Sequence, residues 1–310
     1  MKKLLFIYNT HAGKGLLKSR LAAVLEELAR DWDVTVHPTR GAGDAAELAA
    51  RRAGEFDRIV CGGGDGTLHE VVNGLMALPP EARPEVGYIP AGTTNDFSRN
   101  LSLPRGMEAM ARTAAAGVPR PVDIGRFNGE HFIYVAAFGA FTDVSYNTPQ
   151  PVKNLLGRTA YMLESVTRIA SIQSYPLTVE HDGGVEAGGY CYGMVSNTVS
   201  VGGFKGTPAQ PVALDDGIFE VVLVRQPENP IQLQAVIRAL LTMSPDEGGL
   251  VTSYRTSRLK ITCEQELPWT LDGEFGGAPK TAEILNCQKA VSIVYGKYGA
   301  ASLTRRLRGV

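Results

Sequence analysis

Residues 62–67 read Gly62-Gly63-Gly64-Asp65-Gly66-Thr67, and they directly follow the apolar residues 59–61. Glycines at the end of a buried strand let the backbone approach a ligand closely and direct its N–H groups at an anion. The run therefore predicts a phosphate-binding loop. Because Asp65 cannot itself attract phosphate, a carboxylate within such a loop indicates a magnesium ion between the two.

A second loop of the same kind reads Pro90-Ala91-Gly92-Thr93-Thr94-Asn95-Asp96-Phe97, again after an apolar stretch, residues 86–89. One glycine-rich run after a strand is equally consistent with a tight turn that binds no ligand. Two such loops in register favour a nucleotide site instead, since both can direct backbone N–H groups at phosphates.

The N-terminal part of the chain alternates β-rich runs with helical patterns. Strands are predicted at residues 3–8, 33–37, 58–61 and 86–89, and apolar residues between them recur at helical spacing. Such alternation predicts βαβ units and a parallel sheet covered on both faces. Ligands bind beyond the carboxyl ends of such strands, so the loops at 9–15, 62–67 and 90–97 are expected to converge on one crevice.

From residue 123 onwards the pattern changes to hairpins. Asn128-Gly129 and Asp182-Gly183 lie between β-rich runs and predict tight hairpin turns. Further strands are expected at 190–195, 219–224, 259–263 and 291–295, with helices at 153–172 and 230–242. We therefore predict an α/β nucleotide-binding domain at 1–122, a mostly antiparallel β-rich domain at 123–296 and a C-terminal tail at 297–310.

Composition excludes several classes of function. The 310 residues carry a net charge of −1, so no global field draws the chain to nucleic acid, and none is expected as a partner. The four cysteines show no CxxC spacing and indicate reduced thiols in a cytoplasmic protein. The apolar start stops at Asn9, too short for a signal peptide, and no later segment is long enough for a membrane span.

Two weaker motifs precede and follow the second predicted strand. Residues 41–46 look like a dinucleotide fingerprint, but Asp44 with Glu47 is more simply a helix capping box. The loop at 9–15 contains Gly13-Lys14 but lacks the earlier glycine and the later hydroxyl of a P-loop. It can still contact phosphate through backbone N–H groups.

Two acidic clusters lie in the β-rich part, Leu214-Asp215-Asp216-Gly217 and Leu271-Asp272-Gly273-Glu274. Carboxylates next to glycine most often form turns. A bound nucleotide, however, needs a base for the attacking hydroxyl and further ligands around magnesium, and these clusters can supply both. The five histidines show no metal-ligand spacing; His69 directly follows the Asp65 loop, where it is expected either near phosphate or, by preference, on the helix surface.

These segments together resemble the bacterial diacylglycerol kinase and lipid kinase family. The resemblance rests on residues 63–67, 92–97, 122–125, 214–217 and 272–274, and it runs over essentially the whole chain. NAD kinases and phosphofructokinases share the first loop, whereas the second loop is more specific to lipid kinases. Residues 144–149, 156–161 and 273–277 are similar to the soluble diacylglycerol kinase of Gram-positive bacteria in particular.

The resemblance implies an NAD-kinase-like two-domain fold, α/β followed by a β-sandwich-like domain that binds lipid and metal, with ATP between them. The nucleotide contacts that it implies are Asn9, Thr10, His11, Ala12, Gly13, Thr39, Gly63, Gly64, Asp65, Gly66, Thr67, Leu68, His69, Glu70, Thr93, Asn95 and Asp96. The sequence departs from the family pattern in two places. The loop at residues 9–13 lacks the usual proline and serine, and His69 stands where asparagine is frequent.

The resemblance also implies a metal network and a base. Asp65, Asp96, Asp123, Asp216 and Asp272 correspond to a network of aspartates, water and magnesium. A structural magnesium would be held by the Asp216 side chain and the carbonyls of Ala213 and Ile218. The general base lies within Asp272-Gly273-Glu274; Asp272 is favoured as the nearer partner of the hydroxyl, and both acids remain candidates.

The sequence therefore predicts an ATP- and Mg²⁺-dependent kinase that phosphorylates diacylglycerol to phosphatidic acid. Alternatives are a kinase of another hydroxyl lipid, such as phosphatidylglycerol or a sphingoid base, and a non-catalytic regulator that binds lipid or nucleotide. NAD kinase is disfavoured because residues 92–97 do not fit its second motif. The expected partner is a membrane lipid reached by peripheral contact at the inner face of the cell membrane, and a homodimer is left open.

Charged residues at the expected crevice suggest how a membrane would be reached. Lys14 and Lys18 flank the first loop, and Lys153 and Arg158 begin the predicted helix at 153–172. Basic groups on both lips would be attracted to anionic lipid. Solvated helix ends without a partner are the alternative interpretation.

Overall fold

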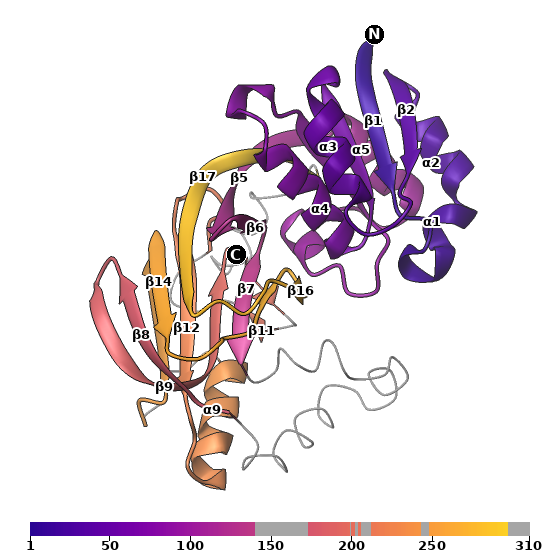
Figure 1. Ribbon diagram of the computed structural model, residues 1–310. Helices are drawn as coiled ribbons and strands as arrows, with labels where there is room; N and C mark the ends of the chain where they lie inside the picture. Colours follow the sequence, from indigo (N-terminus) through magenta and orange to yellow (C-terminus); the bar gives the residue numbers. More distant parts are fainter. Residues whose placement is uncertain (140–172, 199, 202–203, 206–211, 243–247, 297–310) are drawn as a thin grey trace, which may run out of the picture.

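The computed structural model describes residues 1–139, 173–198, 200–201, 204–205, 212–242 and 248–296. The predicted helix at 153–172, with Lys153 and Arg158, and the tail at 297–310 lie outside these residues. In Figure 1 an α/β part (upper right, indigo to violet) adjoins a β-rich part (lower left, pink to yellow).

The α/β part is a parallel sheet in the strand order β2-β1-β3-β4. Its strands are β1 (Lys2–Tyr8), β2 (Trp32–Pro38), β3 (Arg58–Gly63) and β4 (Glu85–Pro90). Its helices are α1 (Leu16–Ser19), α2 (Leu21–Leu28), α3 (Asp44–Arg52), α4 (Asp65–Met76) and α5 (Met107–Ala116), with short 3-10 helices at Ala12–Gly15, Ala53–Glu55, Pro80–Ala82 and Phe97–Asn100. The four predicted strands are confirmed.

Helices cover both faces of this sheet, as the alternation of buried side chains requires. Leu5 and Ile7 of β1 point to one face and share a core with α3 and α4. Leu4 and Phe6 point to the other face and share a core with α2 and α5. Because both faces are buried, β1 and β3 are almost continuously apolar.

The β-rich part is mostly antiparallel. Its elements are β5 (Val118–Phe127), β6 (Glu130–Phe132), β7 (Val135–Gly139), β8 (Tyr175–His181), β9 (Gly184–Ser196), β10 (Ser200–Val201), β11 (Phe204–Lys205), β12 (Phe219–Arg225), α9 (Pro230–Thr242), β13 (Val251–Thr256), β14 (Arg258–Cys263), β15 (Trp269–Leu271), β16 (Glu274–Phe275) and β17 (Thr281–Tyr295). The predicted hairpins at 128–129 and 182–183 are confirmed, with Asn128 at a φ of 50°. So is the helix at 230–242.

Two long strands join the parts. β17 pairs antiparallel with β5 along most of its length and with β14 at its start, and Ile293 near its end pairs in parallel with Val86 of β4. The predicted domain boundary after residue 122 falls inside β5. Strand β17 pairs with the edge strand β4 of the N-terminal sheet. A domain that ends at residue 122 would omit this strand.

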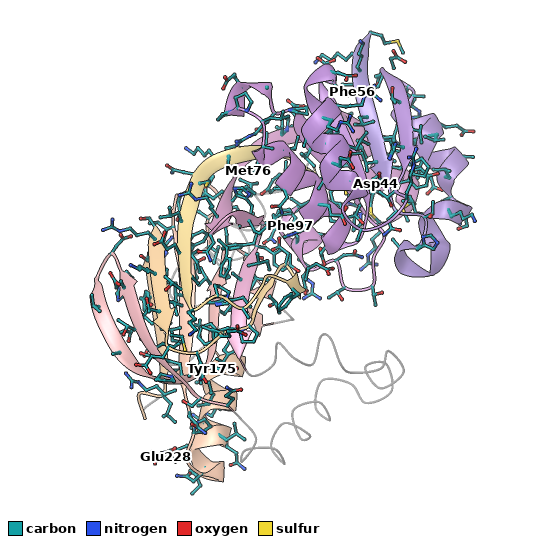
Figure 2. All side chains as sticks on the ribbon, viewed as in Figure 1. Asp44, Phe56, Met76, Phe97, Tyr175 and Glu228 are labelled. Atoms are coloured by element: carbon teal, nitrogen blue, oxygen red, sulfur yellow. The ribbon has the colours of Figure 1, made fainter. Side chains whose placement is uncertain are left out.

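Side-chain packing adds a second junction. Phe97, from the 3-10 helix that follows the second predicted loop, is fully buried, and its ring centre lies 6.1 Å from that of Tyr134, between β6 and β7. Figure 2 labels Phe97 where the two parts meet. The loop after β4 thus rests directly on the segment that leads into β7.

Candidate active site

Three loops meet at the carboxyl ends of β1, β3 and β4, as predicted. The N–H of Ala91 donates to the carbonyl of Gly63 at 2.7 Å, which joins the second loop to the first glycine run. A Cβ on Gly13 would lie 1.9 Å from the carbonyl oxygen of Ala91, and Gly13 has a φ of 54°. Only glycine permits that approach, so the 9–15 loop is also in contact with the second loop.

The loop at residues 9–15 is shaped by its own side chains. Asn9 Oδ1 accepts the N–H of His11 at 2.9 Å, and Thr10 Oγ1 lies 3.1 Å from His11 Nδ1. Thr39, just after β2, donates its N–H to the carbonyl of Tyr8 at 2.9 Å. The predicted contacts from Asn9 to Gly13 and Thr39 therefore share one edge of the sheet.

Helix α4 begins at Asp65, inside the glycine run, and its first-turn N–H groups make this end suited to an anion. Asp65 Oδ2 accepts the N–H of Asp96 at 2.9 Å, whereas the buried Oδ1 has no hydrogen-bond partner among the described residues. Burial, together with the charges of Asp96 and Asp272, raises the pKa of Asp65 to about 6 against the effect of its N–H bonds. A buried acceptor without a donor fits a hard cation.

The side chain of Asn95 closes the second loop into a turn. Its Oδ1 accepts the N–H of Gly92 and its Nδ2 donates to the Gly92 carbonyl, both at 2.8 Å, with Asn95 itself at a φ of 50°. Thr93 is left exposed between these anchors, and Asp96 is buried. Asn95 therefore shapes the loop, and Thr93 and Thr94 are its exposed side chains.

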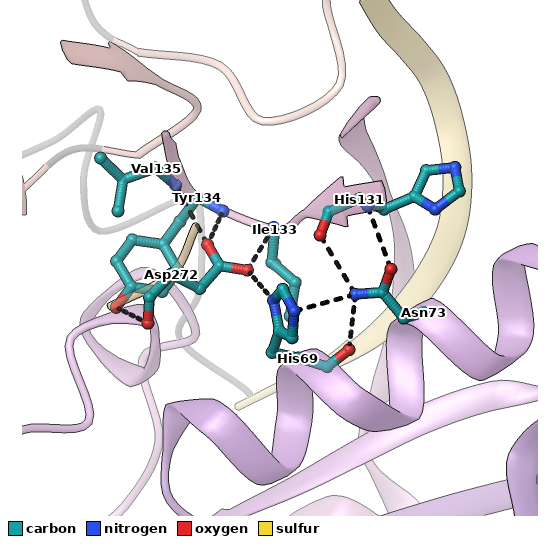
Figure 3. Close-up of polar contacts among 7 residues, drawn as sticks. All are labelled: His69, Asn73, His131, Ile133, Tyr134, Val135 and Asp272. Atoms are coloured by element: carbon teal, nitrogen blue, oxygen red, sulfur yellow. Dashed lines mark hydrogen bonds and ion pairs between the residues drawn. The ribbon is translucent and has the colours of Figure 1, made fainter. Parts of the chain in front are cut away.

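Asp272 lies in the turn between β15 and β16 and is fully engaged. Its carboxylate is 0 % exposed. Oδ1 accepts the N–H groups of Tyr134 and Val135 at 2.9 and 3.1 Å, and Oδ2 accepts that of Ile133 at 2.7 Å and Nδ1–H of His69 at 2.8 Å (Figure 3). Each oxygen thus already has two donors, about as many as a carboxylate oxygen takes.

His69 provides the fourth of those donors from the second turn of α4. Its side chain is 15 % exposed, so the preference for a helix-surface role is wrong. Burial by itself lowers the pKa of His69, but the hydrogen bond with Asp272 and the charges of Asp272, Glu274 and Glu130 outweigh it, and the pKa is raised. The His69 ring therefore connects α4 to Asp272 in the β-rich part.

Glu274 is the exposed acid of the same turn. A Cβ on Gly66 would lie 2.8 Å from Glu274 Oε1, so the carboxylate sits against the first turn of α4. The fold thus brings an exposed carboxylate to the glycine run, 208 residues earlier in the chain. Thr67 and Leu68, the next residues of α4, are buried.

Glu70 has a different neighbour. Its Oε1 and Oε2 accept the N–H groups of Gly43 and Ala45 at 2.9 and 3.1 Å, so it caps the start of α3. The capping box within residues 44–47 is therefore wrong: Gly43 is the N-cap, and Asp44 instead accepts the N–H of Arg40 and pairs with His37. The cap of α3 is therefore a side chain of the neighbouring helix α4.

Asp123, in β5, uses both carboxylate oxygens. Oδ2 accepts the N–H of Gly217 at 2.6 Å and Oδ1 that of Lys289 at 2.7 Å, where β17 bulges. Burial raises the pKa of Asp123 in spite of these bonds. The side chain therefore ties the 214–217 turn to β17.

Asp216 projects from that turn. Its Oδ2 pairs with Arg255 Nη2 at 2.5 Å, and its Oδ1 accepts the N–H of Ile218 at 3.1 Å; Ala213 and Ile218 are partly buried. Within the described residues, no group of three or more His, Cys, Asp or Glu side chains is arranged to hold a metal ion. The cation at Ala213, Asp216 and Ile218 therefore stays a prediction.

Comparison with known proteins bears on this arrangement. A family model described as the diacylglycerol kinase catalytic domain matches residues 3–127. A diacylglycerol kinase from Bacillus subtilis (strain 168) is 35% identical over 306 residues, which are 98% of this chain and 99% of that protein. The chain belongs to the diacylglycerol kinase family. By family it is an enzyme, a lipid kinase.

Solved structures agree with this family. The crystal structure of a diacylglycerol kinase from Bacillus anthracis str. Sterne matches with a TM-score of 0.75 and 25% identity, over 96% of this chain and 98% of that one. An NAD kinase from Archaeoglobus fulgidus in complex with ATP matches with a TM-score of 0.55 and 13% identity, over 99% of both chains. The predicted NAD-kinase-like, two-domain fold is confirmed.

Some of the residues that form the candidate site of this chain were not identified from the sequence. Asn73 bonds both the N–H and the carbonyl of His131, and the N–H groups of residues 133–135 hold Asp272. A polar Asn73 among the apolar positions of α4, four residues after His69, was the available signal. The four cysteines are free, as predicted, and no helix of the described residues is long and apolar enough to cross a membrane.

Proposed function

We propose that the protein transfers the γ-phosphoryl group of ATP to the free hydroxyl of diacylglycerol, in a Mg²⁺-dependent reaction that yields phosphatidic acid and ADP. One observation carries the proposal: Glu274, exposed and against Gly66, lies beside a helix N-terminus where a buried oxygen of Asp65 has no partner in the described part of the chain. Anion binding, a cation ligand and a proton acceptor are then adjacent. The name of the Bacillus subtilis relative supports diacylglycerol as the lipid.

The nucleotide would be bound by backbone groups rather than by a dedicated lysine. N–H groups at the start of α4 and that of Thr93 would contact the phosphates, and Asp65 Oδ1 would hold the magnesium ion. When bound, that ion neutralises charge on the transferred phosphoryl group. The remaining work of the protein is to place the lipid hydroxyl in line with the phosphoryl group and to accept its proton.

Glu274 is our candidate for the general base. The four donors on Asp272 and its complete burial leave no lone pair for a substrate hydroxyl, which supports Glu274 over Asp272, the acid favoured from the sequence. As the lipid oxygen bonds to the γ-phosphorus, the bond to the ADP oxygen breaks, and the hydroxyl proton passes to Glu274. Asp272 then serves to anchor the turn.

The membrane is proposed as the place of encounter with the lipid. Lys18 is exposed beside the first loop, and the charges at Lys14, Lys153 and Arg158 are expected to add to it. At about 1 kcal/mol for each basic residue near an anionic surface, three of them raise membrane residence by roughly 10² at low salt. Charge reversal at Lys14, Lys153 and Arg158 should therefore lower activity on anionic vesicles and spare a short-chain diacylglycerol; unchanged vesicle activity would exclude docking by these charges.

The test of function is direct. The protein is incubated with ATP, Mg²⁺ and separate detergent dispersions of diacylglycerol, phosphatidylglycerol and a sphingoid base, and product masses are recorded. We expect phosphatidic acid, lost with EDTA and with Asp65→Ala. Phosphorylation of another lipid alone would assign a different substrate, and no product from any lipid would indicate a binding regulator.

A further inference from the structure

We propose that His69, supported by Asn73, is a positioning residue for phosphoryl transfer: the pair forms a polar bridge that holds the Asp272–Glu274 turn against α4. This inference rests on the function proposed above. The bridge consists of His69, Asn73, the backbone of His131 and the Asp272 carboxylate, and Figure 3 shows these residues in one continuous chain of contacts.

The bridge begins at Asp272. Three of its four donors are N–H groups of residues 133–135, which belong to the β-rich part itself. His69 Nδ1 is the donor that comes from α4, and it contacts Oδ2 at 2.8 Å across 203 residues of sequence. Among the hydrogen bonds of this carboxylate, only that one ties the turn to the helix that begins in the phosphate loop.

Asn73 fixes the other end of the ring. Its Nδ2 lies 3.2 Å from His69 Nε2, and it donates to the carbonyls of His69 and His131 at 3.0 and 3.1 Å. Its Oδ1 accepts the N–H of His131 at 3.0 Å. Asn73 therefore pairs with β6 as a neighbouring strand would, and it holds α4 at a fixed distance from residues 131–135.

The consequence for the reaction concerns Glu274. Asp272 and Gly273 have φ values of 52° and 92°, so the turn is a tight one whose course depends on its anchored first residue. Glu274 follows directly and lies against Gly66. If Asp272 shifts relative to α4, Glu274 shifts with it, and a displacement of about 1 Å at a reacting group costs up to roughly 10² in rate.

Two substitutions of similar size separate this role from simple packing. In His69→Asn the side-chain Nδ2 takes the approximate place of the imidazole Nδ1 and can still donate to Asp272. In His69→Leu the volume is similar but the donor is lost. The control is His181→Leu, at the end of β8, where the ring stacks on Tyr254 at 4.2 Å; Figure 1 shows β8 on the far side of the β-rich part from α4.

The experiment measures kcat, the KM for ATP and Tm for the parent and the three variants, with diacylglycerol in detergent. For His69→Leu we expect kcat to fall about 10- to 100-fold with the KM for ATP unchanged. His69→Asn should recover most of that loss, and His181→Leu should retain the parental kcat. A parental kcat in His69→Leu, or an equal loss in both His69 variants, overturns the proposal.

A second readout separates this inference from the proposed function. If the parent itself does not phosphorylate diacylglycerol, the proposed function fails, and hydrogen exchange of the amides of residues 130–136 then decides the bridge. Faster exchange in His69→Leu than in His69→Asn supports it. Equal exchange in the two variants overturns it whatever the substrate is.

Discussion

Asp65, at the start of α4, and Asp272, in the turn between β15 and β16, both belong to the candidate active site but differ in how many hydrogen-bond donors their carboxylates have. Asp65 accepts the N–H of Asp96 at Oδ2, and its buried Oδ1 has no hydrogen-bond partner among the described residues. Asp272 has four donors and no exposed surface. An unsatisfied buried oxygen costs stability and is suited to a ligand, whereas a satisfied one holds structure.

The comparison is tested most strongly at Asp65. Asp65→Ala should lower turnover by about 10³-fold or more, because charge on the transferred phosphoryl group is no longer neutralised. Tm measured in EDTA should change little, because the loss of the bond from the Asp96 N–H to Oδ2 is offset by removal of the buried Oδ1, which has no partner among the described residues. Near-parental turnover in a steady-state assay would show that Asp65 is not part of the metal site.

The next effect is expected at Glu274. Glu274→Gln should lower kcat by about 10² to 10⁴, the usual worth of a positioned proton acceptor, with ATP affinity and Tm unchanged. Steady-state kinetics and thermal unfolding of the same preparation measure both. Full activity in this variant would mean that the general base is Asp272 or another residue.

Asp272→Asn should lower stability in addition to kcat, because it releases the turn that positions Glu274. The amide nitrogen cannot accept the bonds that the carboxylate receives, so a buried charge pair and N–H bonds are lost at about 3–5 kcal/mol. Urea unfolding measures the difference. If Asp272→Asn unfolds like the parent, its carboxylate is not the anchor that the contacts describe.

The 214–217 turn is expected to show a smaller, cation-dependent effect. Asp216→Ala should lower the free energy of unfolding by about 2–3 kcal/mol, roughly what a cation at a hundred times its Kd contributes. EDTA should lower the Tm of the parent but not of the variant, and Asp215→Ala is the control. An equal response of parent and Asp216→Ala to EDTA would leave only the ion pair with Arg255.

The smallest effect lies far from the site, at the β8–β9 hairpin. Bonds from the Ser257 N–H and hydroxyl, with Thr256 and Arg258, lower the pKa of Asp182 from 3.8 to about 2. Since the folded pKa lies below the unfolded one, this stabilisation is present above pH 3.8 and is lost as the pH falls towards 2.

Asp182→Asn should accordingly be less stable than the parent at neutral pH. The side chain is 39% exposed and screened by solvent, so the difference should be no more than about 1 kcal/mol. Urea unfolding over a pH series should show the two curves approaching each other in acid. A gap that is constant with pH would mean that the carboxylate charge does not stabilise the hairpin.

The sequence by itself determined the local elements and the edge of the sheet at which three loops converge. Strands β1 to β4, the hairpin turns at 128–129 and 182–183, and the three converging loops follow from residue periodicity and from glycine and asparagine at positions with special backbone angles. These are short-range properties. They depend on which face a side chain takes and which φ a residue tolerates, and both are written within a few neighbouring residues.

Only the tertiary structure decided which distant residues complete the site. The pairing of His69 with Asp272 spans 203 residues, Glu70 caps a helix of another βαβ unit, and β17 returns to pair with β4. No periodicity encodes these contacts, because they depend on how separately formed layers stack. The acids in the 271–274 turn look alike in sequence; burial and four hydrogen bonds make Asp272 an anchor, whereas Glu274 stays exposed.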